Sequence, residues 1–598
     1  MKKFILSLAL LSGILQMSFG QDSSKGQLDG NVSLNLGTNF VMDMSSRTFS
    51  NCAGDFSAWG RYRTEKLMIK LDLQGLNSFV ATTIQGQTID LRTQDAPEMN
   101  MDITQKENSV LEEKAGVLVE YKPDNGNEFS FNVRQGFNRQ TPDKAVISII
   151  NRFDALDYEN MEMFCSFDLE EVLQKENTVD AVAEWKHRFD KPGREIVSGI
   201  GWALSRTDKS SNWHITPVTE VLPEEESEEE EVPDRIYRIT PLYTKNDISA
   251  SVTYRDVDMF SQKSLNLELG MNLKAEFDRN MQSAANFINE EWIDSLEYRE
   301  NFSYFSLNAI PKAKVSYSPG KFKINFQLTP DFYVNNLHND KSKGELKFGK
   351  VYLLPCLDAD WTPSQKHNLG ISYRQGIVRP SFLQMCRFPR IGAYSNEMLM
   401  GNPDLTPGSS SKISLLYTFK SGYFTGNVTG TTTVNWDNIE KVFNNVGDYR
   451  IYTWINSGHS IENNIKLSAK AKLKNFEASL EGYYNYFIGY NNSGAVTRSS
   501  DWGINGDATL SVRGGWSFNV KGRYQSKIIR TYNSITEYIG CDARITKDFR
   551  KFSVFVQGKD LFDQTIEVAT YSEDQTYARI EEIQYNRRIF SIGAAFKF

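Results

Sequence analysis

The chain has 598 residues, and its 75 acidic and 67 basic side chains give a formal net charge of −8. A negative balance of this kind argues against a nucleic-acid-binding protein. Beyond residue 20, no stretch of the sequence reaches the ~18 consecutive apolar residues of a membrane-spanning helix. Mean hydropathy alone would favour a soluble protein, but β-barrel strands are only half apolar and leave little trace in such an average.

The first twenty residues have the organisation of a secretory signal peptide. Two lysines form a short basic start, an apolar run covers residues 4–15, and Ser18 and Gly20 supply small residues two positions apart. The apolar run is too short for a membrane-spanning helix. We therefore expect residues 1–20 to be a cleaved signal peptide and residues 21–598 to form the mature chain. A buried N-terminal helix is the alternative.

The sequence contains none of the residue patterns that mark common active sites or metal centres. Its histidines are isolated, its cysteines form no CxxC pair, and neither a Gly-rich phosphate loop nor a GxSxG pattern occurs. We therefore expect no enzyme activity, no cofactor and no metal site. An exported chain can form disulfides, but five widely spaced cysteines favour free thiols. These cysteines are Cys52, Cys165, Cys356, Cys386 and Cys541.

The N-terminal half gives a mixed pattern. A first strand-like run covers residues 27–41, and an Asp-Asn-Gly turn lies at 124–126. Two long stretches, 75–112 and 139–158, interrupt the pattern. Residues 224–231, between Pro223 and Pro233, include seven glutamates, which predicts a solvated, exposed loop. A binding role for cations or for a partner is the alternative for this acidic run.

The C-terminal half alternates apolar and polar residues with a period of two, which predicts consecutive strands. Runs at 322–328, 465–473 and 516–524 each adjoin a short turn, such as Gly514-Gly515 before the last of them, and paired glycines accept the positive φ of tight hairpins. Short turns alternate with longer connections, as periplasmic turns and extracellular loops do in bacterial barrels. N-terminal to residue 260 this rule falters, because the two long stretches are out of phase.

The last nine residues carry the clearest signal. Apolar side chains alternate with small or polar ones up to a terminal aromatic residue. A soluble edge strand of this kind would normally be blunted or covered. As the closing strand of a barrel, it would face lipid on one side and the lumen on the other. The residues that we assign to this closing and assembly strand are Phe590, Ile592, Phe596 and Phe598.

These patterns predict an all-β protein, a transmembrane antiparallel β-barrel of about 22 strands, since bacterial barrels have even strand numbers. A soluble protein with several β domains is the alternative, but the hairpins continue for several hundred residues without a domain break. One aromatic-rich run predicts the interfacial aromatic girdle of such a barrel, with a ligand-stacking platform as the alternative. Its members are Tyr483, Tyr484, Tyr486, Phe487 and Tyr490.

Three stretches resemble motifs of TonB-dependent receptors, in the same order and spacing. ISYRQGIVRPS at 371–381 resembles their "SYSRRI-RPS" strand, GNPDLTP at 401–407 their "GNPNLKPE" loop end, and KDLFD at 559–563 their "NLFD" near the last hairpin. Residues 345–598 are therefore similar to the barrel half of these receptors, particularly to the outer-membrane β-barrel family common in Bacteroidetes. By analogy these motif residues are structural: Arg374, Arg379, Pro380, Gly401, Asn402, Pro403, Leu405, Pro407, Leu561, Phe562 and Asp563.

The resemblance implies a 22-stranded barrel in the outer membrane of a Gram-negative bacterium. It also implies import of a scarce ligand, driven through the TonB protein, with a plug domain in the lumen and a TonB box near the mature N-terminus. No plug-sized segment and no TonB box is recognisable here. A barrel of this size has a wide lumen, and the candidates to fill it are 75–112, 139–158, 206–234 or a separate protein.

The sequence therefore supports two functions. The first is transport of a bulky ligand across the outer membrane by a plugless barrel that resembles TonB-dependent receptors. The alternative is a structural or interaction subunit of an outer-membrane protein complex. The expected partners are outer-membrane lipid and lipopolysaccharide, the barrel-assembly machinery, and a surface lipoprotein or a separate plug or lid subunit. We expect no nucleic-acid partner.

Overall fold

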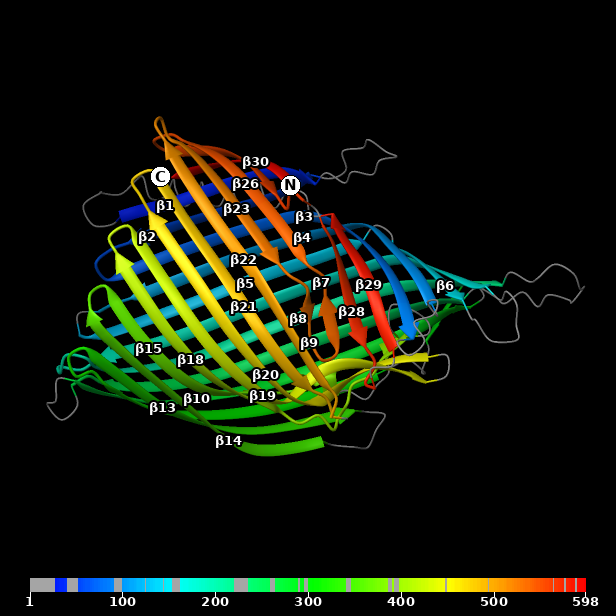
Figure 1. Cartoon of the computed structure of the whole chain (residues 1–598), viewed down its shortest axis with the longest axis horizontal. Helices are drawn as coiled ribbons and strands as arrows, with labels where there is room; N and C mark the ends of the chain where they lie inside the picture. Colours follow the sequence, from blue (N-terminus) through cyan, green and yellow to red (C-terminus); the bar gives the residue numbers. More distant parts are fainter. Residues whose placement is uncertain are drawn as a thin grey trace, which may run out of the picture.

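The computed structural model describes most of the chain (Figure 1). The described residues are 27–39, 52–90, 99–123, 125–142, 145–152, 162–219, 235–258, 264–288, 291–294, 300–339, 346–385, 390–391, 397–446, 449–492, 494–562, 564–574, 577–586 and 589–597. The predicted signal peptide, the acidic run at 224–231, Asp563 and Phe598 lie outside these residues.

The strands form a closed antiparallel barrel of 22 strands, which confirms the predicted fold class. The wall strands are β1 (Gln27–Asn39), β2 (Cys52–Arg63), β3 (Leu67–Asp90), β4 (Met99–Tyr121), β5 (Asn127–Pro142), β7 (Glu162–Arg188), β8 (Arg194–Thr219), β9 (Arg235–Asp256), β10 (Leu265–Ile288), β12 (Glu300–Tyr317), β13 (Phe322–Asn339), β14 (Leu346–Ser364), β15 (His367–Val378), β18 (Gly408–Ser421), β19 (Phe424–Val446), β20 (Tyr449–Lys472), β21 (Phe476–Tyr490), β22 (Val496–Val512), β23 (Trp516–Gln525), β26 (Tyr538–Asp548), β27 (Phe552–Lys559) and β30 (Ile589–Lys597). Pairing of β1 with both β2 and β30 closes the ring.

Shorter elements lie between the wall strands. β6 (Ala145–Arg152) continues the line of β5, because both pair with β4 and β7. The others are β11 (Glu291–Asp294), α2 (Phe382–Met385), β16 (Arg390–Ile391), β17 (Glu397–Leu399), β24 (Ile528–Ile529), β25 (Asn533–Ile535), β28 (Thr565–Tyr571) and β29 (Tyr577–Asn586). In the described ranges, no helix is long and apolar enough to cross a membrane.

The closing strand has the two faces that its sequence predicts. The side chains of Phe590, Ile592 and Phe596 are 41%, 58% and 45% exposed on the outer surface, whereas Ser591 between them is buried. Large apolar side chains are exposed in the same alternating way on the other wall strands. Such a band of apolar side chains on the outside of a closed sheet is the surface that a lipid bilayer covers.

Short turns gather at one end of the barrel and longer connections at the other. We call these the turn end and the loop end. Turns at 64–66, 122–126 and 189–193 join β2 to β3, β4 to β5 and β7 to β8 at the turn end. The alternation of short and long connections therefore holds in the N-terminal half as well, and the prediction that it falters there is wrong.

The sequence also offered three segments as fillers of the lumen, and their described parts lie in the wall instead. Residues 75–90 and 99–112 belong to β3 and β4, 139–152 is almost entirely β5 and β6, and 206–219 belongs to β8. These strands are long because they continue past the membrane: β7 has 27 residues, whereas a tilted strand crosses a bilayer in about 9–11. In Figure 1, β6 and the neighbouring cyan strands reach furthest to the right, at the loop end.

Candidate functional site: the lumen and its loop end

Charged side chains line the lumen on β8, β9, β10 and β12. Leu269 and Ile248 are exposed on the outer surface, so the alternate positions of β9 and β10 face inward. There Arg255 donates from Nη1 to Glu195 (2.9 Å) and from Nε to Glu268 (3.1 Å). Lys312 pairs with Glu268 from the next strand. This chain of alternating charges gives the wall a hydrated, polar surface.

A second tier of charges lies nearer the loop end of the same wall. Lys274 Nζ lies 3.2 Å from Asp247 and also pairs with Glu276, and Lys245 Nζ lies 3.8 Å from Glu276. Ser306 of β12 donates to Glu276 at 3.1 Å. The inner wall of this region is thus built from neighbouring strands that share their ion pairs.

The segment after β15 turns into the lumen and packs against its wall. Phe382 and Met385 of α2 are buried in a cluster with Phe302 and Tyr304 of β12 and Leu337 of β13. The rings of Phe302 and Phe382 meet edge to face at 5.9 Å. Burying these apolar side chains compensates for the entropy of ordering the segment.

Arg379 fixes the start of this segment. Its guanidinium forms an ion pair with Asp331 of β13 and lies 4.2 Å from the ring centre of Tyr333. The Tyr333 hydroxyl in turn bonds to Tyr304 and accepts from Asn335 at 3.1 Å. Arg374, in the same motif, is exposed and contacts Asp358 at 3.5 Å. Of the two motif arginines, only Arg379 is therefore tied into the buried network.

The second motif, GNPDLTP at 401–407, covers the extended tip of the β19–β20 hairpin. Asn402 donates from its side chain to the carbonyl of Trp454 (2.9 Å), and its backbone N–H donates to Gln384 (2.7 Å). The backbone N–H of Thr406 donates to the side chain of Asn456 at 2.7 Å. Gly401, Pro403 and Leu405 are buried, and Pro407 is half-buried. The motif thus links the α2 segment to the hairpin.

A second loop reaches the inner face from β23. Arg530 pairs with Asp501 of β22 at 3.0 Å and lies over the ring of Phe487. Tyr532 is buried against Val442 and Ile455 of the hairpin. Phe487 is only 3% exposed, while Tyr484 and Tyr486 face outward. The girdle prediction is therefore wrong for Tyr483 and Phe487, because alternation along β21 turns both into the lumen.

A third contact comes from the connection after β27, which begins with the third motif. The backbone N–H of Leu561 donates to Cys541 at 2.9 Å, and Phe562 is exposed. Further along, Asn444 of the hairpin donates to Glu573 at 3.3 Å. We call the segments 379–385, 397–407, 530–535 and 571–574 the inner cap. They come from three connections and meet on the tip of β19 and β20.

The residues that hold the inner cap were missed from the sequence. Asp331 and Asp501 are carboxylates on the inner face of ordinary alternating strands, and nothing in their neighbourhood marks them as partners of Arg379 and Arg530. Among the described residues, no group of three His, Cys, Asp or Glu side chains could hold a metal ion. Cys356 and Cys541 are free thiols.

A closed barrel with an apolar outer band and a polar, charged lumen belongs to the outer-membrane class of β-barrel proteins. The model of the outer membrane protein beta-barrel family matches residues 187–598. The chain therefore belongs to this family and resides in the outer membrane of a Gram-negative bacterium. By the topology of such barrels, the turn end faces the periplasm and the loop end the exterior. A search of curated protein sequences finds no match.

Solved structures of TonB-dependent receptors share the fold. The ferric citrate transporter FecA is 11% identical with a TM-score of 0.62, covering 95% of this chain and 78% of that one. The copper transporter OprC is 10% identical with a TM-score of 0.60, covering 97% and 81%. The ferric yersiniabactin uptake receptor FyuA from Yersinia pestis is 10% identical with a TM-score of 0.59, covering 97% and 81%. At such identities the likeness concerns the fold.

Proposed function

We propose that this barrel takes part in transport of a bulky ligand across the outer membrane. The observation that carries the proposal is the polar lumen, with its shared ion pairs on β8 to β12, capped at the exterior by loops held through the Arg379–Asp331 and Arg530–Asp501 pairs. A charged, hydrated wall suits a solute that passes through water. The structural neighbours, titled as transporters and an uptake receptor, support the same reading.

In this proposal the inner cap is the element that moves. Its contacts with the wall are two ion pairs, hydrogen bonds, the small apolar clusters around Phe382 and Tyr532, and the short β17–β20 pairing, whereas the wall strands are joined by long, continuous backbone ladders. In many enzymes the opening of a loop or lid is the rate-limiting step. The ligand would enter from the exterior once the cap leaves the β19–β20 tip.

Single-channel conductance of the folded protein in a planar bilayer tests the proposal. We expect a small conductance for the unmodified protein and a large one for the double variant Arg379→Ala, Arg530→Ala, because both buried ion pairs of the cap are lost. A large, steady conductance of the unmodified protein would contradict a capped transporter. It would mean that another protein seals the lumen in the cell.

That result would favour the second candidate, a subunit of an outer-membrane complex. The long wall from β3 to β10 supports this candidate, because it rises past the membrane at the exterior and offers a broad surface. A surface lipoprotein, or a separate plug or lid subunit, would be the partner. Cross-linking in intact cells from cysteines placed on the loop-end part of β8 would capture such a partner as one defined product.

A further inference from the structure

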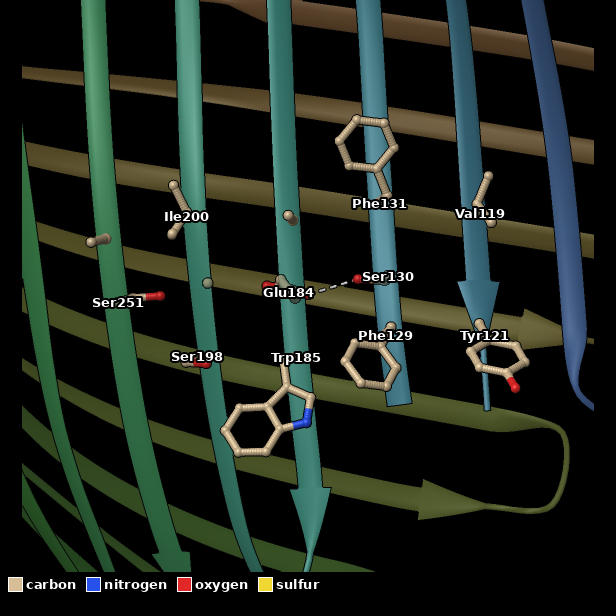
Figure 2. A pocket seen from close by; sticks show the side chains of 13 residues that line it. Val119, Tyr121, Phe129, Ser130, Phe131, Glu184, Trp185, Ser198, Ile200 and Ser251 are labelled. Carbon is tan, nitrogen blue, oxygen red and sulfur yellow. Dashed lines mark hydrogen bonds between the residues drawn. The ribbon is translucent and has the colours of Figure 1, made fainter. Parts of the chain in front are cut away.

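A hollow of about 550 Å³ lies on the outer surface near the turn end, over β4, β5, β7, β8 and β9. Phe129, Phe131, Trp185 and Ile200 line it, with Ser198 beside Trp185 (Figure 2). By strand register, the small side chain of Ala183 lies between Phe131 and Ile200. Many outward positions of the barrel carry large apolar residues. Here the small ones leave a depression in the band that the bilayer covers.

The hollow opens outward. Phe129 is directly across from Trp185, and Phe131 from Ala183, so these side chains share one face of the sheet. Ile200, beside Ala183 on β8, is 66% exposed. Ser130 and Glu184 lie on the opposite face, where they form a hydrogen bond across the lumen side. Figure 2 shows the aromatic rings in front of the strands, with the far wall of the barrel behind them.

The surface becomes polar from the hollow toward the turn end. Trp185 donates from its indole N–H to the side chain of Asn127 at 3.0 Å, and His187 Nδ1 lies 2.9 Å from the same oxygen. Trp and Tyr are typical of the level where lipid headgroups begin. The indole therefore marks the boundary between the apolar part of this surface and its wet rim.

Two cations share one carboxylate below that boundary, on the same outward face. Lys191 Nζ lies 2.5 Å and Arg194 Nη2 3.0 Å from the two oxygens of Asp256. Asp256 pairs with Leu267 on the outward side of β10. Within this group of three side chains one positive charge is in excess, and both cations keep donors for an anion.

We propose that this surface binds one phospholipid of the periplasmic leaflet, with an acyl chain in the hollow and the phosphate at Lys191 and Arg194. The order of groups along β8 matches the parts of such a lipid. Arg194 lies at the headgroup end, Ser198 is level with the Trp185 indole of β7, and Ile200 lies at the level of the acyl chain. Ile200 lies six positions after Arg194, which is about 20 Å along a strand. This suits one leaflet of a ~30 Å hydrocarbon core with its headgroup. The inference does not depend on the transport proposal.

Native mass spectrometry of the purified, folded protein, titrated with phosphatidylethanolamine in mild detergent, tests this inference. We expect one tightly bound lipid on the unmodified protein. Filling the hollow with Ala183→Leu and Ser198→Leu is expected to weaken its binding about tenfold. Arg194→Gln, which leaves the hollow intact, is expected to weaken it as well. The matched control is Ala359→Leu, an outward position on β14 between Leu357 and Trp361, and it should bind like the unmodified protein.

Equal lipid binding by all four proteins would overturn the proposal, because the lipid would then be an ordinary neighbour in the bilayer. A photoreactive residue at position 198 in native outer membranes separates the occupants. We expect the photoreactive residue to cross-link to phospholipid. A dominant cross-linked product with a protein would overturn the proposal, because the hollow would then bind a protein partner. Heat-modifiable migration on gels shows whether each variant is folded. If the variant with Ala183→Leu and Ser198→Leu does not fold, lipid binding by Arg194→Gln tests the proposal.

Discussion

The wall from β8 to β12 and the cap-bearing wall from β13 to β22 both contain arginine–carboxylate ion pairs, but the pairs differ in how deeply they are buried. In the first, Arg255 joins two carboxylates across the lumen face while nearly half of its side chain remains exposed. In the second, Arg379 and Arg530 reach carboxylates that are 5% and 1% exposed. Exposed pairs contribute little to stability, whereas loss of one partner from a buried pair leaves an uncompensated charge.

The difference indicates a division of roles. The exposed pairs of the first wall coat the lumen with charge and leave the barrel ladder to provide stability. The buried pairs of the second wall connect loops to strands through Arg379 and Arg530, which lie just outside the backbone ladders, while residues 397–399 also pair with β20. The two kinds of arginine should therefore respond differently to the same substitution.

The largest effect is expected at the buried Arg379–Asp331 pair. Removing one partner of a buried ion pair costs about 3–5 kcal/mol, which is comparable to what the burial of Phe382 and Met385 contributes. We expect Asp331→Ala to release residues 379–385 from the wall while the barrel stays closed. Hydrogen exchange should show fast exchange in this segment and unchanged protection in β13.

The matched control is Arg374→Ala, in the same motif, whose side chain faces the lumen and is well exposed there. Its contact with Asp358, at 3.5 Å, is worth at most about 1 kcal/mol. Equal exchange at 379–385 in Asp331→Ala and Arg374→Ala would show that the buried pair does not hold the cap.

A smaller loss of stability is expected when a charge is placed on the outer face of the barrel, at Ile592. Ile592 lies on the lipid side of the closing strand, opposite Leu36 and Val556. An arginine near the middle of the lipid face costs about 2–4 kcal/mol, so Ile592→Arg should lower the free energy of unfolding by that amount and reduce assembly. Urea unfolding in lipid vesicles and heat-modifiable migration measure both.

Ser479→Arg is the control for this substitution. Residue 479 faces the lumen on β21, between Lys470 and Asp507 of the neighbouring strands. An arginine there can pair with the carboxylate, and the expected change is within about 0.5 kcal/mol. If both arginines destabilised the barrel equally, the assignment of inner and outer faces would be wrong.

The sequence predicted the faces of the strands better than their lengths. Alternation with a period of two determines which side chains share a face, and it gave the outward set of β30 directly. Long strands of the N-terminal half were taken for loops, because bulges interrupt the alternation. The register shifts between Val80 and Thr82 and between Glu170 and Leu173, and each shift reverses the faces beyond it.

The inner cap could not be predicted for a different reason. Arg379 and Asp331 are 48 positions apart, and Arg530 and Asp501 belong to a loop and a strand with no local signal that links them. Family resemblance drew attention to Arg379 as a residue at a strand exit. Its partner follows only from the way the ring of strands brings β13 beneath the segment after β15.

The smallest effect on stability is expected at Arg255. Its substitution also tests most directly whether the charges on β8 to β10 set the ion selectivity of the lumen. Its substitution by glutamine should change the free energy of unfolding by less than about 1 kcal/mol, because the pairs are solvated. Glu195 and Glu268 would then face the lumen without the cation they share, and lumen charges tune selectivity in barrels. In the channel opened by the double variant Arg379→Ala, Arg530→Ala, the reversal potential in a KCl gradient should shift toward cation preference for Arg255→Gln and stay unchanged for Arg255→Lys. The same reversal potential for glutamine and lysine would place the conducting path away from β8 to β10, and with it the passage that we propose for the ligand.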